Sequence, residues 1–269
     1  MKQAIIITGA AGGLGKAIVD TCLSAFPELL IVATDISPDI ESIPDNDHIL
    51  GMKVDVTHED SIIALRKALE EMGVRVWAIV NNAGVSDFFP VSEKEKDALE
   101  KMFAINTFGA VNMVRAFLPH MMETKGRVVN ISSESVRLPA AFHPYAASKI
   151  ALEALSVSMR NELGLQGIKL SIIRPGAINT MLLDDLYNMK ERIGESIYKE
   201  YLLNFATKAP GEIRKISKPA DVAAVVVKAL TSSKPKRYYR VNNNPKLRVA
   251  ALLPHRVRDY FMKKMLGSA

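Results

Sequence analysis

Short apolar runs rich in β-branched residues alternate with longer segments of helical periodicity along most of the chain. Runs such as "AIIIT" and "LSIIR" are almost continuously hydrophobic, which is typical of strands that are buried on both faces of a parallel sheet. Parallel neighbours need a crossover connection, and the helical segments between the runs supply it. The alternation therefore predicts a doubly wound α/β domain, with a parallel sheet of about seven strands and helices on both faces.

The expected elements can be assigned along the sequence. The predicted strands are Ala4–Thr8, Leu29–Asp35, His48–Asp55, Val76–Asn81, Gly126–Ser132, Lys169–Arg174 and Arg237–Val241. The predicted helices fall near Gly13–Phe26, Glu59–Met72, Glu93–Glu123 (read as two helices), Pro144–Leu163 and Pro219–Thr231. No repeat or linker divides them, so residues 1–244 are predicted to form one domain. Residues 181–217 interrupt it before the last strand, and residues 245–269 form a basic amphipathic extension.

Composition excludes several classes of protein. The single cysteine, Cys22, cannot form an internal disulfide or a multi-cysteine metal site, and the five histidines are scattered, so no metal site is expected. No apolar run reaches the length of about 18 residues that a membrane span needs, and the first residues do not resemble a secretory signal. These features predict a cytoplasmic protein.

A glycine-rich turn joins the first predicted strand to the first predicted helix in "IIITGAAGGLGKAI". Glycines let backbone N–H groups approach a pyrophosphate closely, and the start of a helix favours negative charge. Asp35 ends the second strand, 20 residues beyond Gly15. A carboxylate there can accept both ribose hydroxyls of NAD and would repel the 2′-phosphate of NADP, although it could also be a turn residue. We therefore expect NAD rather than NADP.

Tyr145 and Lys149 lie four residues apart near the start of a predicted helix, and so on one face of it. A free tyrosine is a poor base at neutral pH. A nearby ammonium favours the phenolate and is expected to lower the phenol's pKa toward the range useful for proton transfer.

Several motifs together resemble those of the short-chain dehydrogenase/reductases, in the order in which that family has them over about residues 1–180. "TGAAGGLG" resembles the family's T-G-x-x-x-G-x-G, "VDV" its adenine-contacting segment, and "NNAG" the motif after its fourth strand. Asn106, "NISS", "YAASK" and "RPG" followed by Thr180 complete the set. The likeness implies a Rossmann-fold oxidoreductase that interconverts a secondary alcohol and a ketone with NAD(H).

The resemblance also implies roles for individual residues. Tyr145 would be the acid/base, Lys149 would also hold the nicotinamide ribose, and Asn106 would anchor a water that relays protons. Ser133 is preferred over Ser132 as the catalytic serine, because the second serine acts in related "N-x-S-S" sequences. The implied cofactor-binding residues are Gly9, Gly13, Leu14, Gly15, Asp35, Asp55, Val56, Asn82, Ala83, Gly84, Tyr145, Lys149, Pro175, Gly176, Ile178 and Thr180.

Two alternatives remain open. Because Gly12 is also a glycine, the turn also reads as T-G-x-x-G-x-x-G, which resembles the longer nucleotide-sugar epimerases and dehydratases. "NNAG" and the short stretch after "RPG" favour the dehydrogenase type. The other alternative is a non-catalytic NAD-sensing protein of the same fold, but such proteins usually lose the tyrosine or the lysine, and both are present here.

Substrate specificity in the family resides in three segments, which here are Met181–Phe205, Phe88–Pro90 and Leu138–Phe142. They are rich in Leu, Met, Phe and Tyr. We expect a bulky apolar alcohol or ketone of steroid, retinoid or lipid metabolism. The alternative is that these side chains only pack the substrate lid, residues 181–217, onto the core.

Positive charge is concentrated at the end of the sequence. Residues 233–269 carry a net charge of +9, and the rest of the chain carries −3. Pro254 is expected to divide an amphipathic tail into two short helices, which could lie on an anionic membrane surface or pack across the active-site mouth or a subunit interface. No aromatic stacking platform accompanies the charge, so nucleic-acid binding is not expected. The resemblance implies a homodimer or homotetramer built through the long helices around Met113 and Leu155.

Overall fold

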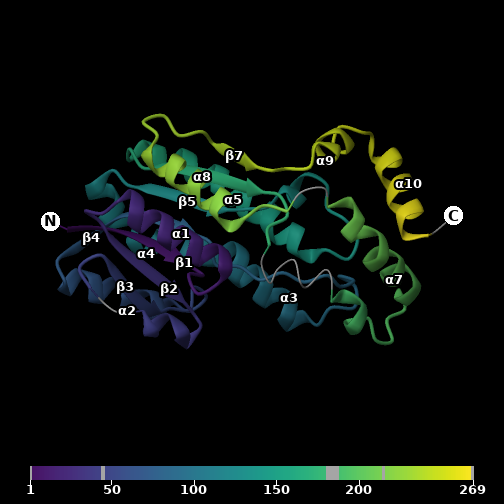
Figure 1. Ribbon diagram of the computed structural model, residues 1–269, viewed down its shortest axis with the longest axis horizontal. Coiled ribbons are helices and arrows are strands. Elements are labelled where there is room, and N and C mark those ends of the chain that lie inside the picture. Colours follow the sequence, from purple (N-terminus) through teal and green to yellow (C-terminus); the bar gives the residue numbers. More distant parts are fainter. Residues whose placement is uncertain (1, 44–45, 180–187, 214–215, 268–269) are drawn as a thin grey trace.

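Seven parallel strands form one sheet in the order β3-β2-β1-β4-β5-β6-β7 in the computed structural model (Figure 1). The structure describes residues 2–43, 46–179, 188–213 and 216–267. The predicted α/β domain with a parallel sheet of seven strands is therefore confirmed.

The elements follow the predicted boundaries closely. The strands are β1 (Lys2–Thr8), β2 (Leu30–Asp35), β3 (Ile49–Lys53), β4 (Val74–Asn81), β5 (Arg127–Ile131), β6 (Lys169–Pro175) and β7 (Tyr238–Val241). The main helices are α1 (Gly13–Ala25), α2 (Glu59–Glu71), α3 (Lys96–Phe103), α4 (Gly109–Thr124), α5 (Pro144–Leu165) and α8 (Pro219–Thr231). The predicted helix pair within Glu93–Glu123 is α3 and α4, joined by one π-helical turn, η2 (Ala104–Phe108).

The chain reverses its direction across the sheet between β1 and β4, which are neighbours although two strands separate them in sequence. In open α/β sheets a crevice forms beyond the carboxyl ends of the strands at this point. Thr8 ends β1 and Asn81 ends β4, so both the glycine turn and "NNAG" leave the sheet at the crevice.

Helices cover both faces of the sheet, and a separate hydrophobic core lies under each layer. α1 and α8 pack on one face through residues such as Ile18, Cys22 and Val226. α2, α4 and α5 pack on the other, where Phe117 is fully buried. Met113 is also fully buried in this core, whereas Ile150 and Leu155 of α5 are partly exposed. The expected homodimer or homotetramer stays a prediction.

The segments after β6 form a smaller layer at one end of the molecule. They comprise η4 (Met189–Arg192), α7 (Lys199–Lys208) and η5 (Ala209–Glu212) before α8, and α9 (Pro245–Ala250) and α10 (His255–Leu266) after β7. α10 lies beside α7 (Figure 1), and Met265 and Leu266 join the apolar cluster around Leu202 and Phe205. Pro254 is the N-cap of α10 and so separates α9 from α10, as predicted. Within the described residues, no helix is both long and apolar enough to cross a membrane.

The glycine turn is held by a backbone contact that leaves no room for a side chain. A Cβ atom at Gly15 would lie 2.0 Å from the carbonyl oxygen of Gly9. Gly9 itself has a φ of +66°, a conformation that favours glycine.

We predict that Gly15→Ala lowers the free energy of unfolding by about 1–3 kcal/mol, because the turn and α1 must move apart to admit the methyl group. Gly164→Ala is the matched control, since it is also in a helix and its Cβ would meet no atom within 4 Å. It should leave stability unchanged or raise it by up to about 1 kcal/mol. Urea unfolding measures both; equal effects of the two changes would contradict the steric argument.

Candidate active site

The glycine turn is tied to "NNAG" by hydrogen bonds across the crevice. The hydroxyl oxygen of Thr8 accepts from the backbone N–H groups of Asn82 (3.1 Å) and Ala83 (3.0 Å). The side-chain amide of Asn82 donates to the carbonyl oxygens of Thr8 and Gly9, both at 3.0 Å. A Cβ atom at Gly9 would lie 2.8 Å from Cα of Ala83. The backbone of the two motifs is thus in direct contact.

The start of α1 faces this contact without a capping side chain. α1 begins at Gly13, after Gly12 as its N-cap, and no side chain of the described residues caps it. Leu14 is half-buried against the core below, and Gly15 is buried. Free N–H groups beside a glycine turn fit the pyrophosphate of a dinucleotide.

Asp35 lies at the carboxyl end of β2 beside the same turn. Its carboxylate accepts from the backbone N–H groups of Ala11 (2.9 Å) and Ser37 (3.0 Å). The side chain is half-buried. It lies at the end of the second strand, as predicted, and it also binds backbone N–H groups as a turn residue does. The two readings of Asp35 are therefore compatible.

The adenine-side residues follow β3. Burial raises the pKa of Asp55, but hydrogen bonds from Thr57 and the neighbouring His58 outweigh it, so that the pKa lies below its usual range. The Asp55 carboxylate accepts from the Thr57 N–H at 2.8 Å and hydroxyl at 2.6 Å. Val56 is buried, and its carbonyl accepts from Asn112.

The predicted nicotinamide-side residues approach the crevice from the other half of the sheet. Pro175 ends β6 and is buried, and Ile178 pairs with Ser217 in an isolated parallel bridge. Gly176 lies against the Asn242 carbonyl, which a Cβ atom would approach to 2.6 Å. Thr180 lies outside the described residues.

α5 places Tyr145, Lys149 and Glu153 at successive i+4 positions on one face. The ammonium of Lys149 is 3% exposed and donates to the Ile131 carbonyl at 2.9 Å. It lies 5.7 Å from the centroid of the Tyr145 ring. Burial lowers the pKa of Lys149 to about 8, although Glu153 raises it.

The pKa of Tyr145 differs from the prediction. Burial raises it to about 12, and only the hydrogen bond with Ser133 acts in the opposite direction. The sequence predicted that Lys149 would lower this pKa, and in the protein alone that prediction is wrong, because desolvation of the phenolate dominates and Lys149 does not contribute to the shift. The phenol holds its proton at neutral pH.

The two candidate serines point to different partners. The half-buried Ser133 shares a hydrogen bond with Tyr145 and also accepts from the Ser135 N–H at 3.2 Å. The buried Ser132 donates to the Glu153 carboxylate at 2.6 Å, and so is turned toward a buried ion pair. Only Ser133 is hydrogen-bonded to the phenol.

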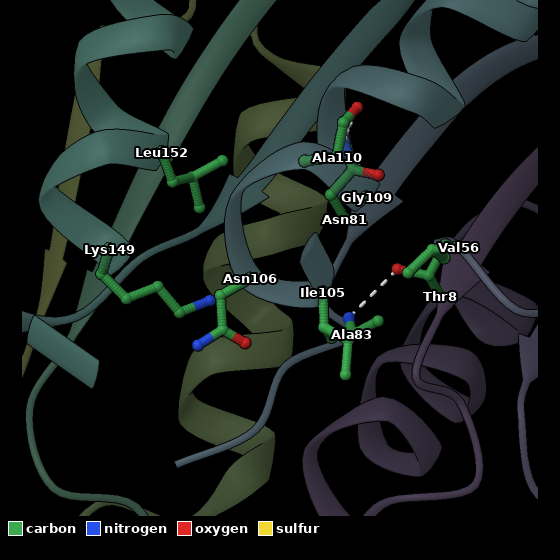
Figure 2. A pocket seen from close by; sticks show the side chains of 10 residues that line it. All are labelled: Thr8, Val56, Asn81, Ala83, Ile105, Asn106, Gly109, Ala110, Lys149 and Leu152. Carbon is green, nitrogen blue, oxygen red and sulfur yellow. Dashed lines mark hydrogen bonds between the residues drawn. The ribbon is translucent and has the colours of Figure 1, made fainter. Parts of the chain in front are cut away.

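Asn106 lies in the π-helical turn η2, and its amide is already engaged. It donates to the Val85 carbonyl (2.8 Å) and the Ser148 hydroxyl (2.9 Å), and accepts from the Val85 N–H (2.8 Å). Both amide hydrogens are therefore engaged within the protein, and the role of Asn106 in anchoring a relay water stays a prediction. Figure 2 shows the Lys149 side chain reaching toward Asn106 at the edge of a cavity of about 10 Å³, which is room for about one water molecule.

Sequence reasoning missed a buried ion pair beside these groups. Arg174 donates from Nε to Glu153 at 2.8 Å and forms a second bond through Nη2. Its guanidinium also stacks on the Tyr238 ring, 4.0 Å from the centroid. Glu153, an acid four residues beyond Lys149 on the same buried helix face, was the signal for this pair.

Aromatic side chains line the approach to Tyr145. The His143 ring stacks on Tyr145 and on Phe88, with centroid distances of 5.4 and 4.3 Å. Burial lowers the pKa of His143 to about 4, so the ring is neutral at pH 7 and adds no charge. Phe142 has a φ of +61°, uncommon for a bulky residue, and contacts Phe205 of α7.

A cavity of about 370 Å³ lies beyond Phe88, between the loop after β4 and the segments that follow β6. Its lining combines apolar and charged side chains: Asp87, Phe88, Phe89, Glu93, Lys94, Glu95, Ala98, Met189, Ile193 and Leu202. Phe88 borders this cavity and also stacks on His143, so one ring joins it to the neighbours of Tyr145.

The chain is similar to known dehydrogenases along most of its length. The family model for short chain dehydrogenases matches residues 3–191. Estradiol 17-beta-dehydrogenase 2 of Rattus norvegicus is 28% identical over 296 residues, which cover 100% of this chain and 77% of that protein. The mitochondrial D-beta-hydroxybutyrate dehydrogenase of Bos taurus is 31% identical over 203 residues, which cover 71% of this chain and 58% of that protein.

Solved structures share the fold. A short chain dehydrogenase/reductase from Burkholderia phymatum in complex with NAD is 22% identical, with a TM-score of 0.76 over 97% of this chain and 95% of that one. An alcohol dehydrogenase from Thermococcus sibiricus complexed with 5-hydroxy-NADP is 21% identical, with a TM-score of 0.70 over 90% and 96%.

The chain thus belongs to the short-chain dehydrogenase family. It is a dehydrogenase/reductase of that family, and the two solved structures that share its fold hold NAD and 5-hydroxy-NADP.

We predict that the two serines separate activity from stability. Ser133→Ala should lower kcat roughly 100-fold or more, as the loss of an oxyanion donor does, with little change in unfolding. Ser132→Ala should instead cost about 1–3 kcal/mol of stability, because the buried Glu153 carboxylate loses a donor. Steady-state kinetics and urea unfolding of both variants check this. If Ser132→Ala lowers kcat more than Ser133→Ala does, Ser132 rather than Ser133 is the serine that acts in the reaction.

Proposed function

We propose that this enzyme uses NAD(H) to interconvert a secondary alcohol and a ketone on a bulky apolar substrate. The observation that carries the proposal is the hydrogen-bonded Ser133–Tyr145 pair with Lys149 one helical turn away. Gly84 of "NNAG", which borders the crevice, lies close to this group: a Cβ atom at Gly84 would be 3.4 Å from Nζ of Lys149.

Each side chain has a distinct part in the proposed reaction. Because the pKa of Tyr145 is raised to about 12, its phenol holds a proton that it can donate to a ketone oxygen. The Ser133 hydroxyl holds that oxygen and stabilises its developing negative charge. A bound nicotinamide supplies the hydride in this direction and accepts it in the reverse. In alcohol oxidation Tyr145 must first lose its proton, and the charge of Lys149 then favours the phenolate.

The choice of NAD over NADP rests on Asp35. Its carboxylate lies at the end of β2, hydrogen-bonded to the N–H of Ala11 in the glycine turn. A negative charge there disfavours a 2′-phosphate and favours free ribose hydroxyls.

The preference for an apolar substrate rests on the rings around Tyr145. Phe88 and Phe142 pack against the cluster that includes Phe205, and the neutral His143 stacks on Phe88 and Tyr145. Rings therefore line the approach to the phenol. The relative named estradiol 17-beta-dehydrogenase 2 acts on a substrate of this kind by its name, and the match to it spans the whole chain.

We predict that purified enzyme oxidises steroid or long-chain secondary alcohols with NAD, and that Tyr145→Phe loses about 100-fold or more of kcat while binding NADH with nearly unchanged affinity. NADH absorbance follows ketone reduction and alcohol oxidation at neutral and at alkaline pH, and reduction should be favoured at neutral pH, because the pKa of Tyr145 is raised to about 12 and its phenol is protonated there. Small polyols and sugars complete the panel.

Two outcomes would contradict the proposal. If small polyols or sugars outperform the apolar compounds, the substrate class is wrong. If no alcohol or ketone turns over although NADH binds, the protein is a cofactor-binding member of the family without this activity. If Tyr145→Phe retains a tenth of the activity, Tyr145 is not the acid/base of the reaction.

We predict that Asp35→Asn lowers the ratio of kcat/KM for NAD to that for NADP by about five-fold or more, because a charge close to the 2′-phosphate is worth at least ~1 kcal/mol. Asp39→Asn, in the exposed turn η1 (Pro38–Ser42), removes the same charge nearby and is the control. A similar shift in both variants would assign the preference to net charge rather than to Asp35.

A further inference from the structure

Exposed apolar side chains recur along α9, the turn after it and α10, and no described part of the chain covers them. Leu252 in the turn is 85% exposed, and Val249, Tyr260 and Phe261 are more than half exposed. Large apolar side chains gathered on one exposed surface mark an interaction site more often than scattered ones do. We call this group, with Val257, the tail surface.

Helical spacing places the exposed residues of α10 opposite its packed face. Met262, Met265 and Leu266 are half-buried, and the last two pack on the cluster around α7. Val257, Tyr260 and Phe261 recur at i, i+3 and i+4, and therefore form one stripe turned away from α7. The helix is thus amphipathic on a side that no described part of the chain covers.

The stripe is bordered by positive charge. Lys264 continues the i, i+3, i+4 series at i+7, and Arg256 and Lys263 lie beside it on the helix. All three side chains are exposed. Residues 245–269 contain six Lys or Arg and one acid, Asp259. Exposed apolar and aromatic residues flanked by bases are typical of helices that lie in the surface of an anionic bilayer.

The tail surface is fixed to both sides of the active site. The N–H of Asn244, just before α9, donates to Glu134 of the loop that follows Ser133, at 2.6 Å. At the other end, the amides of Asn204 and the ammonium of Lys208 in α7 donate to the carbonyls of Leu266 (2.9 Å) and Met265 (2.8 Å). Figure 1 shows α9 and α10 at the same end of the molecule as α7.

We propose that the tail surface docks on an anionic lipid bilayer, with Leu252 and the Val257–Tyr260–Phe261 stripe in the interface and the bases against the headgroups. Docking of the tail surface is a property separate from the proposed reaction. It would hold α7 close to the bilayer. Charge complementarity favours this partner over a second copy of the chain, because two such surfaces facing each other would bring like charges together.

The test is sedimentation of the full chain with vesicles of phosphatidylcholine alone or with about 30 mol % phosphatidylserine. We expect binding to the anionic vesicles only. Leu252→Glu with Phe261→Glu should abolish it, and Lys263→Gln with Lys264→Gln should weaken the partition coefficient about five-fold per charge removed. These changes lie on the exposed side and leave the packed face of α10 intact.

Controls distinguish the tail from the rest of the surface. Leu165→Glu at the end of α5 changes a leucine that is also 85% exposed, and Lys67→Gln with Lys101→Gln removes two exposed charges elsewhere. Neither should alter vesicle binding. Thermal unfolding shows that each variant is folded.

The proposal is overturned if wild-type protein does not bind anionic vesicles, binds neutral ones equally, or is released as much by the controls as by the tail variants. It is also overturned if sedimentation equilibrium shows an oligomer that Leu252→Glu with Phe261→Glu dissociates, because the surface would then join two copies. None of these readouts uses catalytic activity, so they are independent of the substrate proposed above.

Discussion

The close backbone contact between the glycine turn and the loop after β4 is the constraint on which the rest of the site depends. The carbonyl of Gly9 lies where a Cβ atom of Gly15 would be, and the Thr8 hydroxyl binds two N–H groups of "NNAG". This contact closes the bottom of the crevice at the sheet's switch point. The start of α1, Asp35 and the catalytic face of α5 are all positioned relative to it.

Burial controls the charges on that face of α5. It raises the pKa of Tyr145 to about 12 and lowers that of Lys149 to about 8, while Glu153 supports the lysine's charge and is itself neutralised by Arg174. A helix that carries a phenol, an ammonium and a carboxylate at i+4 spacing is stable in the interior only because each group has a partner. The protein alone therefore holds Tyr145 as a proton donor.

The segments after β6 and β7 add a second, apolar layer to this frame. α7 brings Phe205 to Phe142 near Tyr145, and α10 packs against the same helix. The rings that surround Tyr145 and the exposed tail surface thus belong to neighbouring parts of one layer. A change in the packing of α7 would therefore alter both the rings around Tyr145 and the position of the tail surface.

Local spacing was enough to determine the sheet, the order of the motifs and the placing of Tyr145, Lys149 and Asp35, since periodicity and helix geometry act between residues near each other in the chain. Tertiary structure alone decided that Ser132 binds Glu153, that Glu153 pairs with Arg174, and that Met113 faces the core. It also reversed the expected pKa shift of Tyr145. The reason is that burial and choice of partner depend on contacts between residues far apart in sequence, which no local pattern records.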